Sequence, residues 1–119
     1  MKLYMKLGSV KGESKDAGFV GQIELTHMDF PNLAATNVGQ PAGGPGMRYV
    51  SKQFDKTSTT IYLMLKNGET IPQVLLTAVW KEKKIQYTLN FVHIVGLSNN
   101  QDGTESLDLQ YNSTTFKMS

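Results

Sequence analysis

Two stretches of the chain carry the clearest structural signal: residues 10–25 read Val-Lys-Gly-Glu-Ser-Lys-Asp-Ala-Gly-Phe-Val-Gly-Gln-Ile-Glu-Leu, and residues 104–116 read Thr-Glu-Ser-Leu-Asp-Leu-Gln-Tyr-Asn-Ser-Thr-Thr-Phe. In both, apolar residues recur at every second position, which is the period of a β-strand with one buried face. The first stretch opens with a polar turn that contains glycine. We therefore expect a β-rich protein, and neither stretch contains a catalytic motif.

Other stretches with the same alternation extend this prediction to most of the chain. The expected strands are residues 2–7, 19–30, 47–54, 71–80, 85–97 and 107–111. In residues 85–97 the apolar positions run through Leu89 and Phe91 and then change to Val92 and Ile94. Such a change of phase indicates a β-bulge or a change in which face of the strand is covered.

Residues 57–66 leave two interpretations open. Many of them are β-branched, and Asn67-Gly68 is a strong hairpin signal, which favours a strand that turns into the next one. Against this, Ile61, Met64 and Leu65 have the spacing of a helix face, and Gly68 stands where a left-handed cap glycine would stand. The residue pattern alone does not decide between a hairpin and a helix that ends at Gly68.

Size and composition indicate a single domain, residues 1–119. The chain is long enough for one hydrophobic core, and charged residues make up 18% of it, with a net charge of +2. A nucleic-acid-binding protein usually needs a larger basic stripe, so we expect no nucleic-acid partner. The many uncharged polar residues can be buried against another protein at lower cost than charged ones.

Cysteine usage and hydropathy bound the cellular context. The sequence has no cysteine, which excludes disulfides and thiolate metal sites. Residues 1–8 are too short and too interrupted for the apolar region of a signal peptide. Residues 74–80, the longest nearly apolar run, fall far below a membrane span. We therefore expect no membrane insertion, and export would have to proceed without a signal peptide.

Side chains that could carry chemistry are few and scattered. His27 and Asp29 would share one face of a strand, but a metal site would need a further ligand, and nothing in the sequence brings His93 to them. Glu13 and Asp16 lie in a charged turn and are more simply solvated. There is no nucleophile motif and no phosphate-binding loop. We expect no enzyme activity, no catalytic residue, no cofactor and no metal, and a core or interface role for Trp80.

Several segments, in their shared order, resemble the hemolysin-coregulated protein (Hcp) family, the tube subunit of type VI secretion. The matching segments are residues 10–16, 21–25, 54–58, 68–74 and 105–109. Between the last two segments, the single residues Tyr87, Val95, Leu97 and Ser98 also match. The resemblance implies a small β-barrel of two packed antiparallel sheets with one short flanking α-helix, as in tail-tube proteins. It also favours the helix over the hairpin for residues 57–66.

The resemblance implies a function as well. Family members form hexameric rings that stack into a hollow tube, which a contracting sheath propels to deliver effectors. The implied partners are further copies of the chain, the sheath and spike components, and effectors, and the implied export route from the cytoplasm is type VI secretion. Two alternatives stay open: a small β-barrel that binds a ligand, and a phage-type tail-tube protein.

Residues 31–46 are the main discontinuity in the pattern. They contain three prolines, four glycines and no charged residue, which excludes a regular element. The chain is shorter here than usual family members, whose longer loop is implicated in ring contacts. We expect this loop to contribute contacts between subunits or rings, with a plain connection as the alternative. The predicted contact residues are Pro31, Asn32, Leu33, Asn37, Gln40, Pro41 and Pro45.

Overall fold

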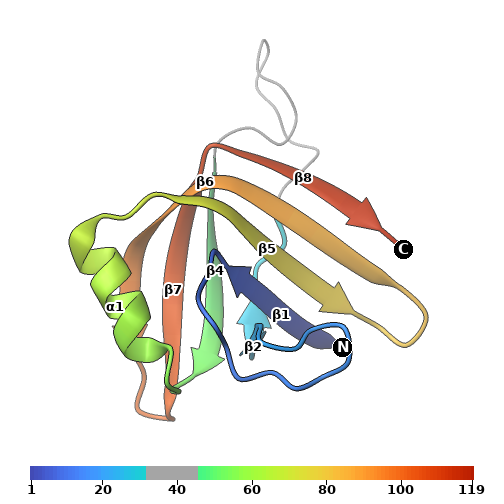
Figure 1. Cartoon of the computed structure of the whole chain (residues 1–119), viewed down its shortest axis with the longest axis horizontal. Coiled ribbons are helices and arrows are strands. Elements are labelled where there is room, and N and C mark those ends of the chain that lie inside the picture. Colours follow the sequence, from blue (N-terminus) through green and yellow to red (C-terminus); the bar gives the residue numbers. More distant parts are fainter. Residues whose placement is uncertain (32–45) are drawn as a thin grey trace.

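The computed structural model describes residues 1–31 and 46–119 (Figure 1). Its elements are, in chain order, β1 (Lys2–Leu7), β2 (Ile23–Leu25), β3 (His27–Met28), β4 (Gly46–Gln53), α1 (Ser58–Asn67), β5 (Ile71–Val79), β6 (Lys84–Asn99), β7 (Thr104–Tyr111) and β8 (Ser113–Met118). The protein is thus mainly β with one helix, as the sequence predicts.

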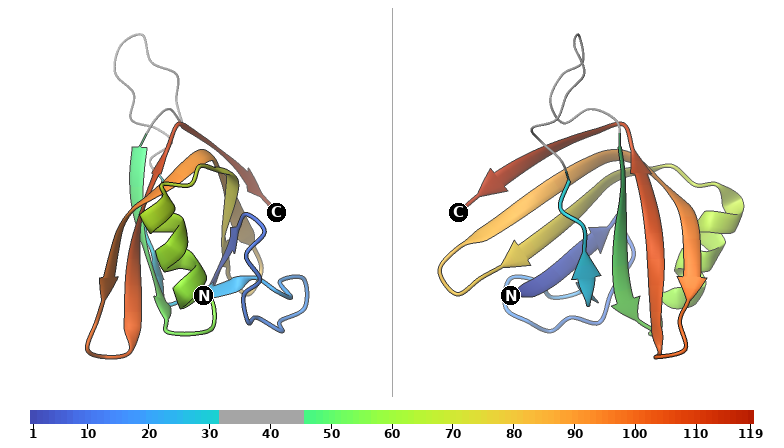
Figure 2. Two further views of the ribbon diagram at one scale, coloured as in Figure 1. Left: turned by 60° about the vertical axis from the view of Figure 1, so that its left-hand side comes forward. Right: turned by 180° about the vertical axis from the view of Figure 1, so that it is seen from behind.

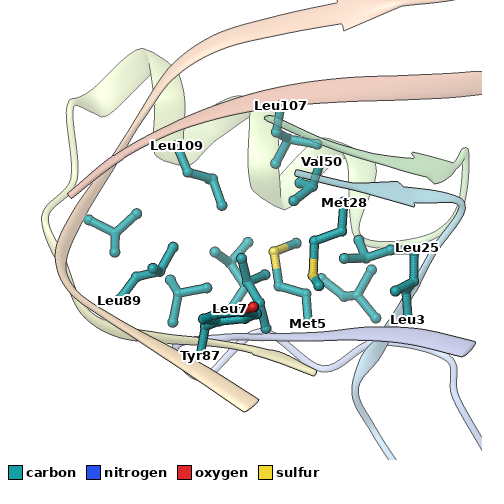
Figure 3. Packing of buried hydrophobic residues seen from close by; sticks show 14 of the residues in the cluster. Leu3, Met5, Leu7, Leu25, Met28, Val50, Tyr87, Leu89, Leu107 and Leu109 are labelled. Atoms are coloured by element: carbon teal, nitrogen blue, oxygen red, sulfur yellow. The ribbon is translucent and has the colours of Figure 1, made fainter. Parts of the chain in front are cut away.

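The strands form two antiparallel layers that share one long strand. Sheet A has the order β2-β1-β5-β6-β8, and sheet B has the order β6-β7-β4-β3. The apolar side chains of both sheets meet between the layers, where Met5, Leu7 and Leu89 of sheet A lie opposite Val50 and Leu107 of sheet B (Figure 3). The two packed sheets are confirmed, while the word barrel is loose, because the hydrogen-bonded path is open between β2 and β3.

Strand β6 turns the corner between the sheets, as its change of apolar phase predicts. Leu89 and Val92 are both buried, and Phe91 between them has a left-handed φ of 53°. This kink reverses the alternation, so Phe91 points outward and is 55% exposed, which corrects the placement of this residue on the buried side. The ladder between β5 and β6 skips Pro72 opposite the kink. The missing proline N–H therefore falls where no regular ladder bond exists.

The helix, and not the hairpin, forms at residues 58–67. Gly68 has φ 63°, and its N–H donates to the Leu65 carbonyl while that of Glu69 donates to the Met64 carbonyl, both at 3.1 Å. These two bonds define a Schellman motif, which needs a left-handed residue after the helix. Ile61 is completely buried, so the apolar stripe of α1 packs on the core.

The strand predicted for residues 19–30 is wrong over its first part. Only Ile23–Leu25 and His27–Met28 are strands, and residues 8–22 form a loop that folds back on itself, with the Gly12 N–H donating to the Gly21 carbonyl at 2.7 Å. Gly18 and Gly21 have φ of 84° and 80°, which an extended strand does not allow. Phe19 instead stacks on Tyr4 of β1, with ring centroids 4.1 Å apart.

Candidate functional surfaces

Of the predicted contact residues, only one lies in the part of the chain that the structure describes. Pro31 is buried at the end of the segment that carries β3. Asn32, Leu33, Asn37, Gln40, Pro41 and Pro45 lie outside the described residues. Their role in subunit contacts therefore stays a prediction.

The structure keeps the two histidines in separate contacts. His27 and Asp29 share a face, as predicted, with His27 Nε2 3.0 Å from Asp29 Oδ1. His93 Nε2 instead lies 2.8 Å from the Thr70 hydroxyl. Among residues 1–31 and 46–119, no group of three or more His, Asp or Glu side chains could hold a metal ion.

Asp16 belongs to a small polar cluster on β1. Its carboxylate accepts hydrogen bonds from the Tyr4 hydroxyl at 2.5 Å and from Lys2 Nζ at 3.2 Å. These two bonds lower the pKa of Asp16. Burial and the bond to Asp16 together raise the pKa of Tyr4 to about 12. This cluster and the Phe19 stack fix the loop of residues 8–22 to the outer side of sheet A.

A buried ion pair, which the sequence reasoning did not find, lies beneath the start of α1. Lys52 Nζ is 2.6 Å from Glu105 Oε1, and the two side chains are 0% and 2% exposed. Lys52 and Glu105 are direct partners in the β4–β7 ladder. Both occupy the inward phase of their strands, in line with Val50 and Leu107. The ion pair could have been found from the sequence, because Lys52 and Glu105 carry opposite charges at positions where the alternation of their strands predicts apolar residues.

Further hydrogen bonds tie this ion pair to the helix. The Ser58 hydroxyl donates to Glu105 Oε1 at 2.8 Å, and Lys52 Nζ lies 3.1 Å from Asp55 Oδ1. Burial acts to raise the pKa of Asp55, but hydrogen bonds from Thr57 and Lys52 outweigh it, and the pKa of this carboxyl is lowered. The network joins β4, β7 and the first turn of α1, so its role is to hold these elements together.

The outer face of sheet B, which we call the sheet B face, is polar and uncovered. Figure 2 (right) shows β4 and β7 in front of α1 with no described element over them. The outward positions of its strands carry His27, Met47, Tyr49, Ser51, Gln53, His93, Ser98, Thr104, Ser106, Asp108 and Gln110. Met47 is the one aliphatic side chain in this set, and Val95, at the register shift of β6, is exposed as well. Hydrogen-bonding groups therefore dominate the face.

Three hydroxyls form the centre of the sheet B face. The hydroxyl oxygens of Tyr49, Ser51 and Ser106 lie 3.0 Å from one another. Hydrogen bonds from Ser106 and Ser51 lower the pKa of the Tyr49 phenol. Asn100 Nδ2 donates to Ser106 Oγ at 3.2 Å, which extends the network to the β6–β7 turn. The hydroxyls satisfy one another, and no acid–base pair of the kind that activates a nucleophile is present in this network.

The outer face of sheet A, the sheet A face, differs in charge and in cover. Its outward positions include Lys2, Lys6, Lys84 and Lys117. Lys84 Nζ lies 5.8 Å from the centroid of Phe19, which is part of the loop that covers Tyr4. This face is therefore basic and partly covered.

Apolar side chains remain exposed at the end of the molecule opposite α1. Phe30 and Trp80 form a T-shaped pair, with ring centroids 6.1 Å apart, and Phe30 also contacts Tyr87. Trp80 is half-buried and packs against the core, which is one of the two roles expected for it. Phe116 and Met118 of β8 are 51% and 56% exposed. This group, which we call the open end, is available for contact with a partner.

A depression of about 340 Å³ lies at the paired ends of β1 and β2, lined by residues that include Lys2, Tyr4, Glu24 and Thr26. It is open to solvent and is not enclosed by the sheets. No helix in the described ranges is long and apolar enough to cross a membrane.

Comparison with solved structures shows the fold. The structure of Hcp2 from Salmonella typhimurium matches with a TM-score of 0.72 at 21% identity, over 99% of this chain and 94% of that chain. That of a mutant form of Hcp1 from E. coli EAEC 042 matches with a TM-score of 0.77 at 17% identity, over 98% of both chains. The tube terminating cap of the anti-feeding prophage matches with a TM-score of 0.59 at 10% identity, over 98% of this chain and 88% of that chain. No curated protein matches in a sequence search. The chain thus has the fold of these Hcp proteins and, at a lower TM-score, of the prophage cap protein.

The sequence places the chain within this class. The model of the family described as type VI secretion system effector, Hcp, matches residues 4–118. The chain belongs to this family and is a structural subunit of the type VI secretion tube, as the resemblance implied. Family membership also implies self-assembly and interaction with the type VI secretion system.

Proposed function

We propose that this chain, as a single domain of residues 1–119, forms hexameric rings that stack into the inner tube of a type VI secretion system. The observation that carries the proposal is the family match, which spans the whole described fold from β1 to β8. The role is structural and not catalytic.

Ring formation requires two different surfaces on each subunit. A head-to-tail contact closes into a ring when its rotation permits. The open end, with Phe30, Phe116 and Met118 exposed, lies on the opposite side of the molecule from α1, where Tyr62 and Leu63 are also exposed (Figure 1). Two apolar surfaces on opposite sides suit such a contact.

The further partners follow from this role. The sheath and spike components would contact the assembled tube, and effectors would be carried or propelled by it. The chain would be made in the cytoplasm and exported by the type VI machinery. These partners and this route rest on the family and define what a secretion assay should detect.

The predicted contact loop enters the proposal as a separate element. Deletion of residues 39–44 should leave the β-sandwich folded, because the strands and the helix on either side supply a continuous buried core. It should weaken ring assembly or stacking, as measured by native mass and electron microscopy. Unchanged assembly and secretion would make the loop a plain connection.

The mass of the native protein tests the main proposal. Light scattering and native mass spectrometry at high concentration should give a ring of six subunits. A strictly monomeric protein that retains a bound small molecule would favour the ligand-binding alternative instead. Secretion that depends on the sheath would then separate a type VI tube from a phage-type tube.

A further inference from the structure

Cationic side chains gather around the open end. Strands β5 and β6 are joined there by a turn in which the Trp80 N–H donates to the Lys83 carbonyl at 2.8 Å. The end of β8 lies beside this turn, because Lys84 and Ser119 exchange backbone hydrogen bonds of 2.9 and 3.0 Å (Figure 1). The turn and the strand end together carry four exposed lysines, Lys81, Lys83, Lys84 and Lys117. Glu82 is the one acidic side chain in the turn.

The apolar side chains of the open end lie on the side of sheet A that elsewhere forms the core. Phe116 is the ladder partner of Tyr87, and Met118 is the ladder partner of Ile85. Tyr87 and Ile85 are buried, whereas Phe116 and Met118 are more than half exposed. The described residues therefore leave apolar surface uncovered where the core side of sheet A reaches the end of the molecule.

Cationic and apolar groups are interleaved at this end. Lys117 lies between Phe116 and Met118 along β8. Lys83 Nζ is 5.5 Å from the centroid of the Trp80 ring. The aliphatic stem of a lysine can lie along apolar surface while its ammonium group extends beyond it. The lysines can therefore keep their charges at the rim of a contact whose centre is apolar.

The positive charge of the open end is largely unopposed. Four lysines against one glutamate give this end more positive charge than the whole chain carries, which is +2. Asp29, which precedes Phe30, lies 3.0 Å from His27 Nε2. Asp16, beneath the neighbouring loop, already accepts hydrogen bonds from Lys2 and Tyr4. The partner that fits this end is therefore one that combines negative charge with apolar depth.

We propose that the open end of the free subunit docks on the surface of an anionic lipid bilayer. Acidic headgroups attract lysines, and the layer beneath them accepts apolar side chains such as Phe116 and Met118. Tryptophan is enriched at this boundary, which suits Trp80 between the lysines and the core. A nucleic acid would satisfy the lysines but would offer no apolar layer. The contact is peripheral, and a neighbouring subunit on the open end would exclude it.

Fluorescence of Trp80 tests the docking directly, because it is the only tryptophan of the chain. The full chain is titrated at low salt with vesicles of phosphatidylglycerol and phosphatidylcholine, and with vesicles of phosphatidylcholine alone. The anionic vesicles should shift the emission to shorter wavelength, and lipids brominated on their acyl chains should quench it. Neutral vesicles should do neither. Binding to anionic vesicles without quenching would overturn docking through the open end.

A pair of matched variants tests the role of the lysines. Lys81→Gln with Lys83→Gln should weaken binding to anionic vesicles about tenfold, because each lysine near an anionic surface adds to the attraction. The control Lys56→Gln with Lys66→Gln removes the same charge from exposed positions near α1, on the opposite side of the molecule. It should weaken binding about twofold or less. Equal losses in the two double variants would overturn the assignment to the open end.

Two further measurements separate this proposal from its alternatives. Oligoglutamate that binds as tightly as anionic vesicles would point to an acidic protein and would overturn the lipid partner. Native mass measured on the same samples separates docking from the tube. Single subunits that dock and never form rings would overturn the proposed function and leave the docking intact. Rings that persist at every dilution and ignore the vesicles would overturn the docking and leave the function intact.

Discussion

The two ends of the sandwich complete the core in different ways. At the end beneath α1 the chain closes the core by itself, with a helix, a Schellman motif and a buried ion pair. At the open end the described residues leave Phe30, Phe116 and Met118 partly exposed. Intramolecular contacts thus fix the shape at one end, whereas at the other end apolar side chains of the described residues remain exposed.

Breaking the ion pair should give the largest effect on the closed end. Replacing Glu105 by Leu removes the carboxylate 2.6 Å from the buried Lys52 ammonium and leaves Asp55, 3.1 Å away, as its remaining ion-pair partner, which should lower the free energy of unfolding by about 3 kcal/mol. That is a large share of the total for a domain of this size. Urea unfolding followed by circular dichroism measures the change. The double variant Lys52→Met with Glu105→Leu should recover much of the loss; equal loss in both would contradict a cost due to the buried Lys52 charge.

Tyr4 should make the stability of the fold sensitive to alkaline pH. An unfolded tyrosine loses its proton near pH 10, whereas the folded protein holds the Tyr4 proton up to a pKa of about 12. The stabilisation is complete below pH 10 and is lost as the pH rises from 10 through 12, by roughly 2–3 kcal/mol in all. Denaturant titrations at a series of pH values should show this loss.

The matched variant for this prediction is Tyr4→Phe. It keeps the ring that stacks on Phe19 and removes the hydroxyl that donates to Asp16. Between pH 10 and 12 the variant should lose less of its free energy of unfolding than the parent protein, and the difference should equal the roughly 2–3 kcal/mol assigned to Tyr4. Parallel curves for the two proteins would exclude the tyrosine as its source.

The cap of α1 should affect the free energy of unfolding less than the Lys52–Glu105 ion pair or Tyr4 does. Gly68→Val places a β-branched residue at φ 63°, and we expect a loss of about 1 kcal/mol or more. Gly68→Asn should cost less, because asparagine tolerates the left-handed conformation. Thermal and urea unfolding rank the two variants. If valine is no worse than asparagine, the left-handed conformation of the cap is not what stabilises the helix end.

The open end should respond to substitution in assembly and hardly at all in stability. Phe116→Ser and Met118→Ser should each change the free energy of unfolding by about 0.5 kcal/mol or less, because both side chains are half exposed already. Native mass spectrometry should show fewer complete rings. Unchanged assembly would show that this surface contacts no other subunit.

The sequence predicts those elements whose evidence is local. β1 and β7 follow from plain alternation, and the corner in β6 follows from the change of phase between Leu89 and Val92. The helix needed the family resemblance, because β-branched residues and Asn67-Gly68 support a hairpin equally well. Residues 19–22 were misread because alternation gives no sign that Gly18 and Gly21 adopt positive φ.

The functional surfaces were harder to predict than the strands. Alternation says which side chains share a face, but it does not say which strands lie side by side. The Lys52–Glu105 pair and the hydroxyls of Tyr49, Ser51 and Ser106 depend on pairings between residues about fifty positions apart. Such pairings are tertiary, so the charge difference between the two outer faces also became visible only in the structure.

Strand β6 belongs to both sheets, so the order in which its neighbours pair with it should determine the order of folding. Short connections join β6 to β5 and β7, whereas β1 must reach across most of the chain to pair Lys2 with Val79. Local hairpins close faster than distant strand pairs. We expect the β5–β6–β7 meander to form in the transition state, with φ-values at Leu89 and Leu107 above those at Leu3 and Leu25. A newly made chain would then assemble its sandwich from the middle of β6 outward and add its first-synthesised strand late.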